Sequence, residues 1–539
     1  MENNNENAIM ETKSGMYKIG ILVLVFAAIL AVLSFFIVPS QGGLVSSTEL
    51  QSTALQNADP KMGETLPIQE VGMGSSGRSI IIALVMLTHV LFANLHLGGS
   101  LFAIVTLSIY LKNKKERYNR LARSVTLFNV ILFSTGATFA VGGVLFFIAL
   151  YPAFASNLFH LYWWPFLVEA IMFALEILFL YAFWFSWGKI SKIWHQVLGY
   201  GYVVAVFIQT FLINMVAGGM LTPGTGITWG STGGMTLDWP TALSWWFNAS
   251  VWRLTFHRFA ASISFFGFLI AMLSMFHYKD RKDLASKREW DWAGSYGVAW
   301  GLLGLVFQPV LGLLYMLQIQ SAQPDAFEMI MHGSRAWEML LMVTLLSALF
   351  LTTLIYFSNR RERILSLPEY KNIQKFYKIF IWVAAVCAFF LVQPAWLGSN
   401  SINNSDAWAN PIGTMDFKYA AIFTLVIIGT AMLMIDTISI GAIRESEWGN
   451  LSKTSQAAGI MSGALGMWIV IVMGYVRESA RSPWLIYNII PVPGRQTYPT
   501  PIPISRIYIV WFIILMVVTM IFWFVSKVTA HHPEKAEEV

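Results

Sequence analysis

The sequence predicts an all-α, polytopic membrane helix bundle. Of its 539 residues, 56% are hydrophobic and only 12% are charged. The mean hydropathy is +0.60, which is far above that of a water-soluble protein of this size. Apolar stretches of the length needed to cross a bilayer, about 20 residues, recur along the whole chain.

About twelve stretches satisfy this length criterion. In chain order, the predicted helices are 16–38, 79–111, 125–150, 163–187, 194–219, 253–277, 292–318, 336–358, 374–396, 416–442, 455–475 and 505–526. The first stretch is too long for the apolar core of a signal peptide and lacks a clear small-residue cleavage site, so we expect a retained helix. An even number of helices places both termini on one side.

Basic residues gather in every second loop, and this pattern orients the bundle. The basic loops are 112–123, 188–195, 278–288, 359–375 and 443–453. The positive-inside rule makes these loops cytoplasmic, and both termini with them. The net charge of +6 therefore reports topology in an inner, cytoplasmic membrane and gives no reason to expect nucleic-acid binding.

Four segments are predicted. They are an N-terminal helix with an outer loop (1–78), a main helix bundle (79–358), two additional helices (359–454), and C-terminal helices with a cytoplasmic tail (455–539).

The strongest local anomaly is a charged cluster where an apolar helix ends. Arg477, Glu478 and Arg481 follow the apolar run 468–475 on the predicted outer side. Charge at a membrane boundary is costly unless it has a partner. The cluster is therefore a candidate site for an anionic or metal-bearing group.

Topology sorts the nine histidines. His195 and His277 lie beside inner loops, where we expect solvated surface roles. His89, His96 and His257 lie within apolar helices, where an ionisable side chain is costly and usually functional. The alternative for them is a polar residue hydrogen-bonded between helices. His89 and His96 are seven positions apart on one helix face, roughly 10 Å along the axis, so they cannot bind the same iron.

Two acids and two methionines complete the candidates. Glu169 and Glu176 also lie seven positions apart in an apolar run, which favours a proton path or iron ligation over helix-to-helix hydrogen bonding. Met339 and Met342 lie one turn apart, and a thioether can pair with histidine on low-spin haem. With 25 methionines in the chain, gap filling is the competing interpretation. The single cysteine, Cys387, excludes thiolate clusters and covalent CxxCH haem attachment.

Most of these candidate residues share a similar predicted depth in the membrane. His89, Glu169, His257, Met339, Met342 and Glu478 all fall near the outer ends of their predicted helices. We therefore expect a cofactor cluster in the outer half of the membrane.

Four segments resemble subunit I of the cytochrome bd oxidase family. His89-Val-Leu-Phe is similar to the run around the family's high-spin haem ligand, and Val168-Glu-Ala-Ile-Met with Glu176 to its two-glutamate helix. Met220-Leu-Thr-Pro with Phe256-His257 resembles the approach to the low-spin haem histidine. Glu478, Arg481, Pro483 and Trp484 match the spacing of the family's Glu-Tyr-Gly-Arg-Gln-Pro-Trp signature.

The resemblance implies roles for these residues. His89 and Glu478 would ligate the iron of two high-spin haems, and His257 with Met342 or Met339 would hold the low-spin haem. Glu169 and Glu176 would carry protons or ligate beside the high-spin pair. Arg481 would pair with Glu478 or with a propionate, and Trp484 would line the haem site. The implied cofactors are two or three haems of type b, with haem d as the alternative type for one of them.

The departures from the family concern the electron donor and the helix count. Only 318–335 stands where the family has a long hydrophilic quinol-binding loop, and Arg335 precedes Met339 by four positions. The N-terminal helix and helices 374–396 and 416–442 are additional, and Asp416 with Lys418 permits a rival alignment. His96 has no usual counterpart, which indicates an additional ligand or an altered haem arrangement.

Three functions compete. The first is a terminal oxidase core that reduces oxygen, with a c-type cytochrome or quinol as donor and a second bd-type membrane subunit as partner in the bilayer. The second is a b-haem electron-transfer subunit that does not reduce oxygen. A secondary transporter would explain the helices, but not the co-located His, Glu and Arg.

Overall fold

The fold is known from a computed structural model. It describes residues 75–229, 235–236, 238–331, 336–361, 373–393, 412, 415–439, 448–481, 484–491 and 504–530. Ten helices within these residues are long and apolar enough to cross a membrane, and Phe376–Val392 is a shorter apolar helix. These elements confirm the all-α membrane bundle. The predicted helix 16–38 lies outside the described residues, as do Arg335 and Pro483.

The described chain forms two compact units. Val144–Val251 belong to a smaller unit, and Ser75–Gly143 with the chain from Trp252 onward to a larger one. Helix α4 (Glu116–Leu150) passes from the larger unit into the smaller.

Two long antiparallel helices dominate the smaller unit. They are α6 (Trp163–Phe185) and α7 (Lys192–Leu221), and they pack along each other. Short helices α5 (Pro152–Leu161) and α8 (Trp239–Trp246) and an antiparallel pair, β1 (Thr228–Trp229) with β2 (Met235–Thr236), complete it. The indole of Trp246 donates to the Leu161 carbonyl at 3.0 Å, which ties α8 to the end of α5.

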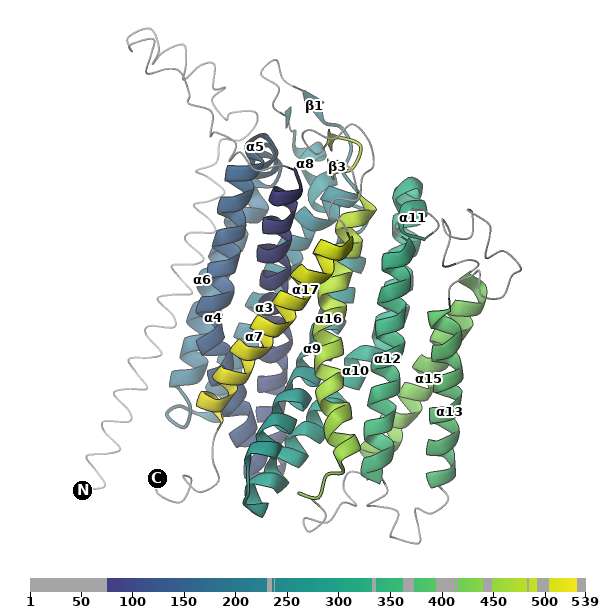
Figure 1. Ribbon diagram of the computed structural model, residues 1–539. Helices are drawn as coiled ribbons and strands as arrows, with labels where there is room; N and C mark the ends of the chain where they lie inside the picture. Colours follow the sequence, from purple (N-terminus) through teal and green to yellow (C-terminus); the bar gives the residue numbers. More distant parts are fainter. Residues whose placement is uncertain are drawn as a thin grey trace, which may run out of the picture. The chain divides into compact units, whose positions relative to one another are not determined.

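The larger unit contains the other long helices (Figure 1). They are α3 (Ser75–Asn113), α9 (Val251–Asp280), α10 (Leu284–Ala322), α12 (Ala336–Arg361), α13 (Ile373–Val392), α15 (Met415–Ser439), α16 (Lys453–Ala480) and α17 (Ile504–Thr529). The short helix α11 (Pro324–Met331) lies between α10 and α12 in the chain. A short hairpin, β3 (Trp484–Ile486) with β4 (Ile490–Pro491), follows α16. Helix α12 packs mainly on α16 and α13, α15 packs on α13 and α10, and α3 packs on α16 and α17.

Several helices begin earlier than the hydropathy predicts, because polar residues cap them. Asp283 accepts a hydrogen bond from the Ser286 amide at 2.7 Å, so α10 starts eight residues before the predicted 292. The same hydrogen bonds lower the pKa of the Asp283 carboxyl. Ser191 and Ser452 cap α7 and α16 in the same way. The apolar pattern therefore locates the membrane segment, and the cap locates the helix end.

Glycines allow α9 and α10 to approach closely. A Cβ on Gly267 would lie 2.2 Å from the backbone nitrogen of Gly301, and a Cβ on Gly297 would lie 2.7 Å from the carbonyl oxygen of Gly267. Small residues at such contacts bring backbones together where no hydrophobic effect drives association. This contact fixes α9, which carries His257, against α10.

We expect Gly267→Ala to destabilise the protein by about 1–3 kcal/mol, because backbone atoms must move to admit the methyl group. Gly142→Ala is the matched control, since its new Cβ would meet only Val85, at 4.0 Å. Thermal unfolding of both variants in one detergent provides the measurement. Equal midpoints would contradict the close-approach interpretation.

Candidate functional site

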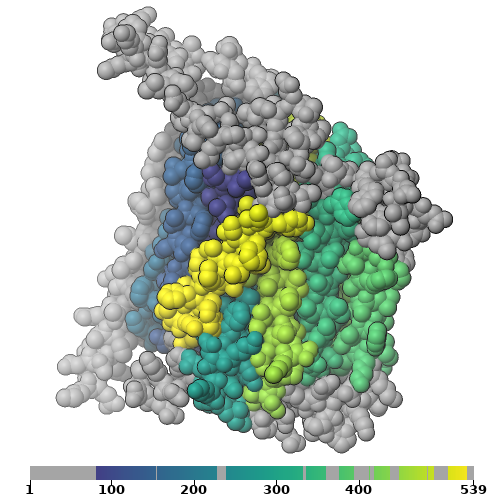
Figure 2. Space-filling view, viewed as in Figure 1, coloured from purple at the N-terminus to yellow at the C-terminus, as the bar shows by residue number. Residues whose placement is uncertain are grey.

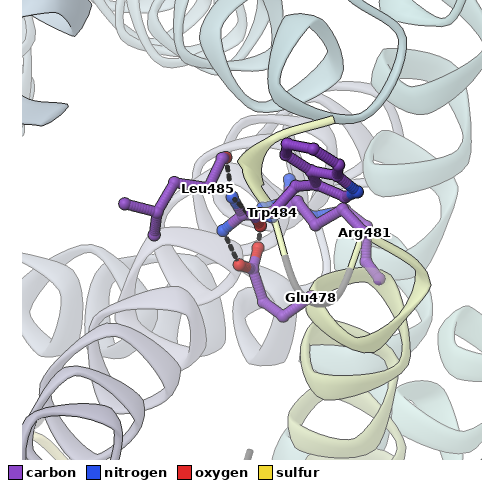
Figure 3. A network of polar contacts seen from close by, with 5 residues as sticks. Glu478, Arg481, Trp484 and Leu485 are labelled. Carbon is purple, nitrogen blue, oxygen red and sulfur yellow. Dashed lines mark hydrogen bonds and ion pairs between the residues drawn. The ribbon is translucent and has the colours of Figure 1, made fainter. Parts of the chain in front are cut away.

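The charged cluster predicted from the sequence forms a network of ion pairs at the end of α16. The guanidinium of Arg477 donates to Oε1 of Glu478, and that of Arg481 donates to Oε2 (Figure 3). The Glu478 side chain is 41% exposed, whereas that of Arg481 is 9% exposed. Arg481 thus makes the first of its two predicted pairings, that with Glu478, and its pairing with a propionate stays a prediction.

Arg481 also organises the chain after the helix. Its Nη1 donates to the backbone carbonyl of Leu485 and lies 3.5 Å from that of Trp484 (Figure 3). Trp484 and Leu485 belong to β3, and the Trp484 amide donates back to the Arg481 carbonyl at 2.7 Å. One buried guanidinium therefore joins the end of α16, its carboxylate and the hairpin.

Two further residues extend this network from α9 and α10. Arg258 interacts electrostatically with Arg477, and Tyr315 interacts with both Arg477 and Glu478. We call Arg258, Arg477, Glu478 and Arg481 the arginine cluster. Arg477 and Arg481 pair with Glu478, and Arg258 adds a third guanidinium that interacts with Arg477, an arrangement suited to anionic groups such as propionates.

His257 lies beside this cluster. Its ring stacks against Tyr315, with centroids 6.2 Å apart, and its Nε2 faces Gly312, 3.5 Å from the position a Cβ would take. The His257 backbone carbonyl accepts a hydrogen bond of 2.8 Å from Gln308. The imidazole itself makes no hydrogen bond to a described residue, so a buried nitrogen lone pair is available for a ligand.

His89 is held differently. Its Nδ1 lies 3.3 Å from the carbonyl oxygen of Gly136 on α4. An imidazole whose Nδ1 binds a backbone carbonyl presents Nε2 in a fixed orientation, which is the usual arrangement of a metal-ligating histidine. Arg258 also interacts electrostatically with His89, which relates this histidine to the arginine cluster.

His96 is more deeply packed than His89. It is 6% exposed, its ring meets Phe133 edge-on at 5.5 Å, and its imidazole hydrogen-bonds the backbone of Leu132. This environment is typical of a histidine held between α3 and α4, the alternative stated for it above. Ligation by His96 stays a prediction.

The two methionines lie near the start of α12. Met339 is 6% exposed, and Met342 is half-buried. Helix α12 packs mainly on α16 and α13, whereas the described contacts of His257 come from α10. Pairing of either methionine with His257 on one iron therefore stays a prediction.

Glu169 and Glu176 lie on α6 of the smaller unit. Glu176 is 5% exposed and accepts a hydrogen bond of 2.6 Å from Nε2 of Gln209 on α7. Gln209 also donates to the Met172 carbonyl at 3.3 Å. Glu169 interacts electrostatically with Glu176, and it makes no hydrogen bond to a described residue. The two carboxyls therefore form a pair in which only one is held by a side chain.

Sequence reasoning missed Arg258, Tyr315 and Gln209. Arg258 carried a visible signal, because it is a cation next to His257 within an apolar run. Tyr315 and Gln209 carried none, since their roles depend on which helix faces which.

The solvated surface roles predicted for His195 and His277 are wrong. His195 is 7% exposed and His277 is 3% exposed. His195 Nδ1 lies 2.9 Å from the Ser186 hydroxyl, and His277 stacks on Trp290 with ring centroids 4.2 Å apart. Aromatic side chains of helices bury these imidazoles, Phe183 beside His195, and Trp290 and Trp523 beside His277. The apolar pattern of the helices does not report such packing.

We expect Arg481→Gln to destabilise the protein by about 1.5–3 kcal/mol, because hydrogen bonds to a charged group are lost at both the Glu478 carboxylate and the Leu485 carbonyl. Arg477→Gln is the control, since Arg477 is 25% exposed and bonds only the carboxylate among the described residues. Thermal unfolding and limited proteolysis at 484–491 measure the difference. If the control loses as much stability as Arg481→Gln, the anchoring role of Arg481 is wrong.

Comparison with known proteins shows the family of the chain. No curated protein matches the chain. The solved structure of the bd oxidase from Geobacillus thermodenitrificans is 14% identical, with a TM-score of 0.49, and the match covers 85% of this chain and 96% of that one. The family described as cytochrome bd terminal oxidase subunit I matches residues 79–535, which include every candidate residue above. The chain therefore belongs to the cytochrome bd terminal oxidase subunit I family.

Proposed function

We propose that this protein is the haem-bearing core of a terminal oxidase that reduces oxygen to water. Family membership brings haem cofactors, respiratory electron transport and a multi-pass membrane location. The observation that carries the proposal is the presence in the larger unit of two histidines suited to metal binding, His89 oriented by the Gly136 carbonyl and His257 buried against Tyr315, together with the ion pairs of Glu478. These are metal-ligand and anion-binding groups.

The residues present fit haem. His257 offers a buried imidazole without a hydrogen-bond partner among the described residues, and His89 offers Nε2 because Nδ1 faces the Gly136 carbonyl. Glu478 uses one position on each carboxylate oxygen for its ion pairs, and a carboxylate has about four. It therefore keeps acceptor capacity for iron, while the arginines suit propionates.

Each group then takes a definite role. His89 and Glu478 would hold the iron of a high-spin pair, and His257 with Met342 or Met339 would hold a low-spin haem. Bound haem supplies reversible one-electron redox chemistry. Arg258, Arg477 and Arg481 would keep anionic groups near this end of the larger unit, and Trp484, the first residue of β3, would line the haem site.

We assign proton transfer to two carboxyl groups of the smaller unit. Glu176 is buried and bound by the neutral amide of Gln209, so it can gain or lose a proton without leaving a cation unpaired. Glu169, seven positions away on the same helix face, would accept the proton next. We infer uptake from the cytoplasmic side, with both termini inside and the haems toward the outer face of the inner membrane.

The electron donor is a c-type cytochrome or quinol bound in a non-standard way. Only residues 323–335 connect α10 to α12, and the short helix α11 occupies most of this connection. This leaves no long hydrophilic loop there. A second bd-type membrane subunit is the expected partner.

The alternative is a b-haem electron-transfer subunit that does not reduce oxygen. The short α10–α12 connection and the additional His96 favour it, whereas the Glu478 cluster and the paired Glu169 and Glu176 favour the oxidase.

Difference spectra distinguish the two functions. We expect reduced-minus-oxidised spectra with low-spin b signals and a CO-reactive high-spin component. A b-type spectrum without CO reactivity would support the electron-transfer alternative, and absence of haem would overturn both.

His257→Ala should abolish the low-spin signal and leave the CO-reactive component, because it removes one axial ligand. His277→Ala is the control for loss of a buried imidazole, since His277 binds Ser526 at the other end of α9. Met339→Leu and Met342→Leu test the second ligand. The variant that converts the low-spin haem to high spin has lost the ligating methionine. An unchanged low-spin signal in His257→Ala would refute the assignment.

Glu176→Gln should slow oxygen reduction by tenfold or more, in line with the roughly 10²–10⁴-fold effect of removing a proton-transfer group. The amide keeps the side-chain shape, so haem spectra should match those of the unmodified protein. Glu116→Gln is the control, since Glu116 is an exposed carboxylate bonded to Tyr110. Steady-state oxygen consumption measures the effect, and unchanged turnover would remove Glu176 from the proton path.

A further inference from the structure

A groove lies between α9 and α17, at the opposite end of α9 from His257. It encloses about 220 Å³ and is lined by Phe276, Lys279, Asp280, Thr519, Met520 and Trp523. We call it the α9–α17 groove. Figure 2 shows the yellow surface of α17 beside the teal surface of the helices around residue 280. All its residues belong to the larger unit.

The walls of the groove are apolar and aromatic. The rings of Phe276 and Trp523 meet edge-on with centroids 5.2 Å apart. The Met520 side chain is 57% exposed, and the Thr519 hydroxyl is satisfied within α17 by the Leu515 carbonyl at 2.6 Å. The walls therefore offer an apolar contact surface with few polar groups left to bind water.

The rim of the groove is charged, and the carboxylate of Asp280 at this rim already pairs with a lysine. Lys527 Nζ lies 3.3 Å from Asp280 and 4.3 Å from the centroid of the Trp523 ring. Lys279 makes no ion pair with a described side chain. Asp283, the nearest other acid along the chain, accepts the Ser286 amide at the start of α10. A positive charge is thus presented next to an apolar wall.

The groove lies where two apolar membrane segments end, because Asp280, the last residue of α9, pairs with Lys527 in the last turn of α17. Lys279, Arg281 and Lys282 make the chain basic at this end of α9, which the positive-inside rule assigns to the cytoplasmic side. Basic pockets between membrane helices on the cytoplasmic side bind the head groups of anionic lipids. An indole such as that of Trp523 is also favoured at this depth.

We propose that the α9–α17 groove binds one anionic phospholipid. The lipid phosphate pairs with Lys279, and the acyl chains extend along the apolar surface of α17 past Met520. Free phosphate would use this cation but gain nothing from the apolar walls, so the walls favour a lipid. This site is separate from the proposed haem site and does not depend on it.

The test compares lipid binding by the full-length protein and by Lys279→Gln. Both are purified in neutral detergent, titrated with phosphatidylglycerol and examined by native mass spectrometry. We expect the unmodified protein to keep one tightly bound lipid and the variant to bind it about fivefold more weakly, as expected for one basic residue near a lipid surface. Lys282→Gln, in the same loop but outside the groove lining, is the matched control and should bind like the unmodified protein.

Two further measurements separate the possible ligands. Phosphatidylcholine should bind more weakly than phosphatidylglycerol, and millimolar inorganic phosphate should not displace the lipid. Met520→Asp, which places a carboxylate on the apolar wall, should weaken lipid binding without altering the basic rim. Equal lipid affinity in Lys279→Gln, Lys282→Gln and the unmodified protein would overturn the proposal, as would displacement of the lipid by phosphate.

Discussion

The cost of placing charge in a membrane is the constraint on which the larger unit depends. Glu478 lies within the last turn of α16, and it is tolerated there because Arg477 and Arg481 each bind one of its oxygens. Helix α16 therefore continues to Ala480, five residues beyond its predicted end at 475. Arg481 then binds the Leu485 carbonyl, so the same charge that extends the helix also fixes the hairpin that follows.

The same constraint explains how α13 and α15 are joined to each other. Lys418 on α15 is 6% exposed, and its ammonium group donates to the carbonyls of Leu391 and Gln393 at 3.0 and 2.8 Å. These carbonyls lie at the C-terminal end of α13, where helical backbone groups lack partners within the helix. A buried cation and unsatisfied carbonyls are each costly alone, and together they join α13 to α15. Helices α13 and α15 are therefore integral parts of the larger unit.

Composition and hydrophobic periodicity were sufficient to predict the membrane helices. They were not sufficient to predict which residues of different helices contact each other. Every predicted membrane segment among the described residues is a helix, because an apolar run of that length has no other structure that satisfies its backbone. The Glu478–Arg481 pair was also predictable, since three positions on a helix bring side chains together. The partners of His257 and Glu176 were not, because Tyr315 and Gln209 come from helices whose facing sides no local pattern reveals.

The groups that bind Glu478 and Glu176 differ, and this difference gives the two carboxylates different properties. Glu478 is bound by two guanidinium groups, which favour its ionised form, and protonating it would leave positive charge uncompensated in the cluster. Glu176 is bound by an amide that carries no charge, so neither protonation state strands a partner ion. A permanent charge suits the holding of a cofactor, whereas a carboxyl that can change state suits proton transfer. The different roles proposed for these acids therefore follow from the groups that bind them.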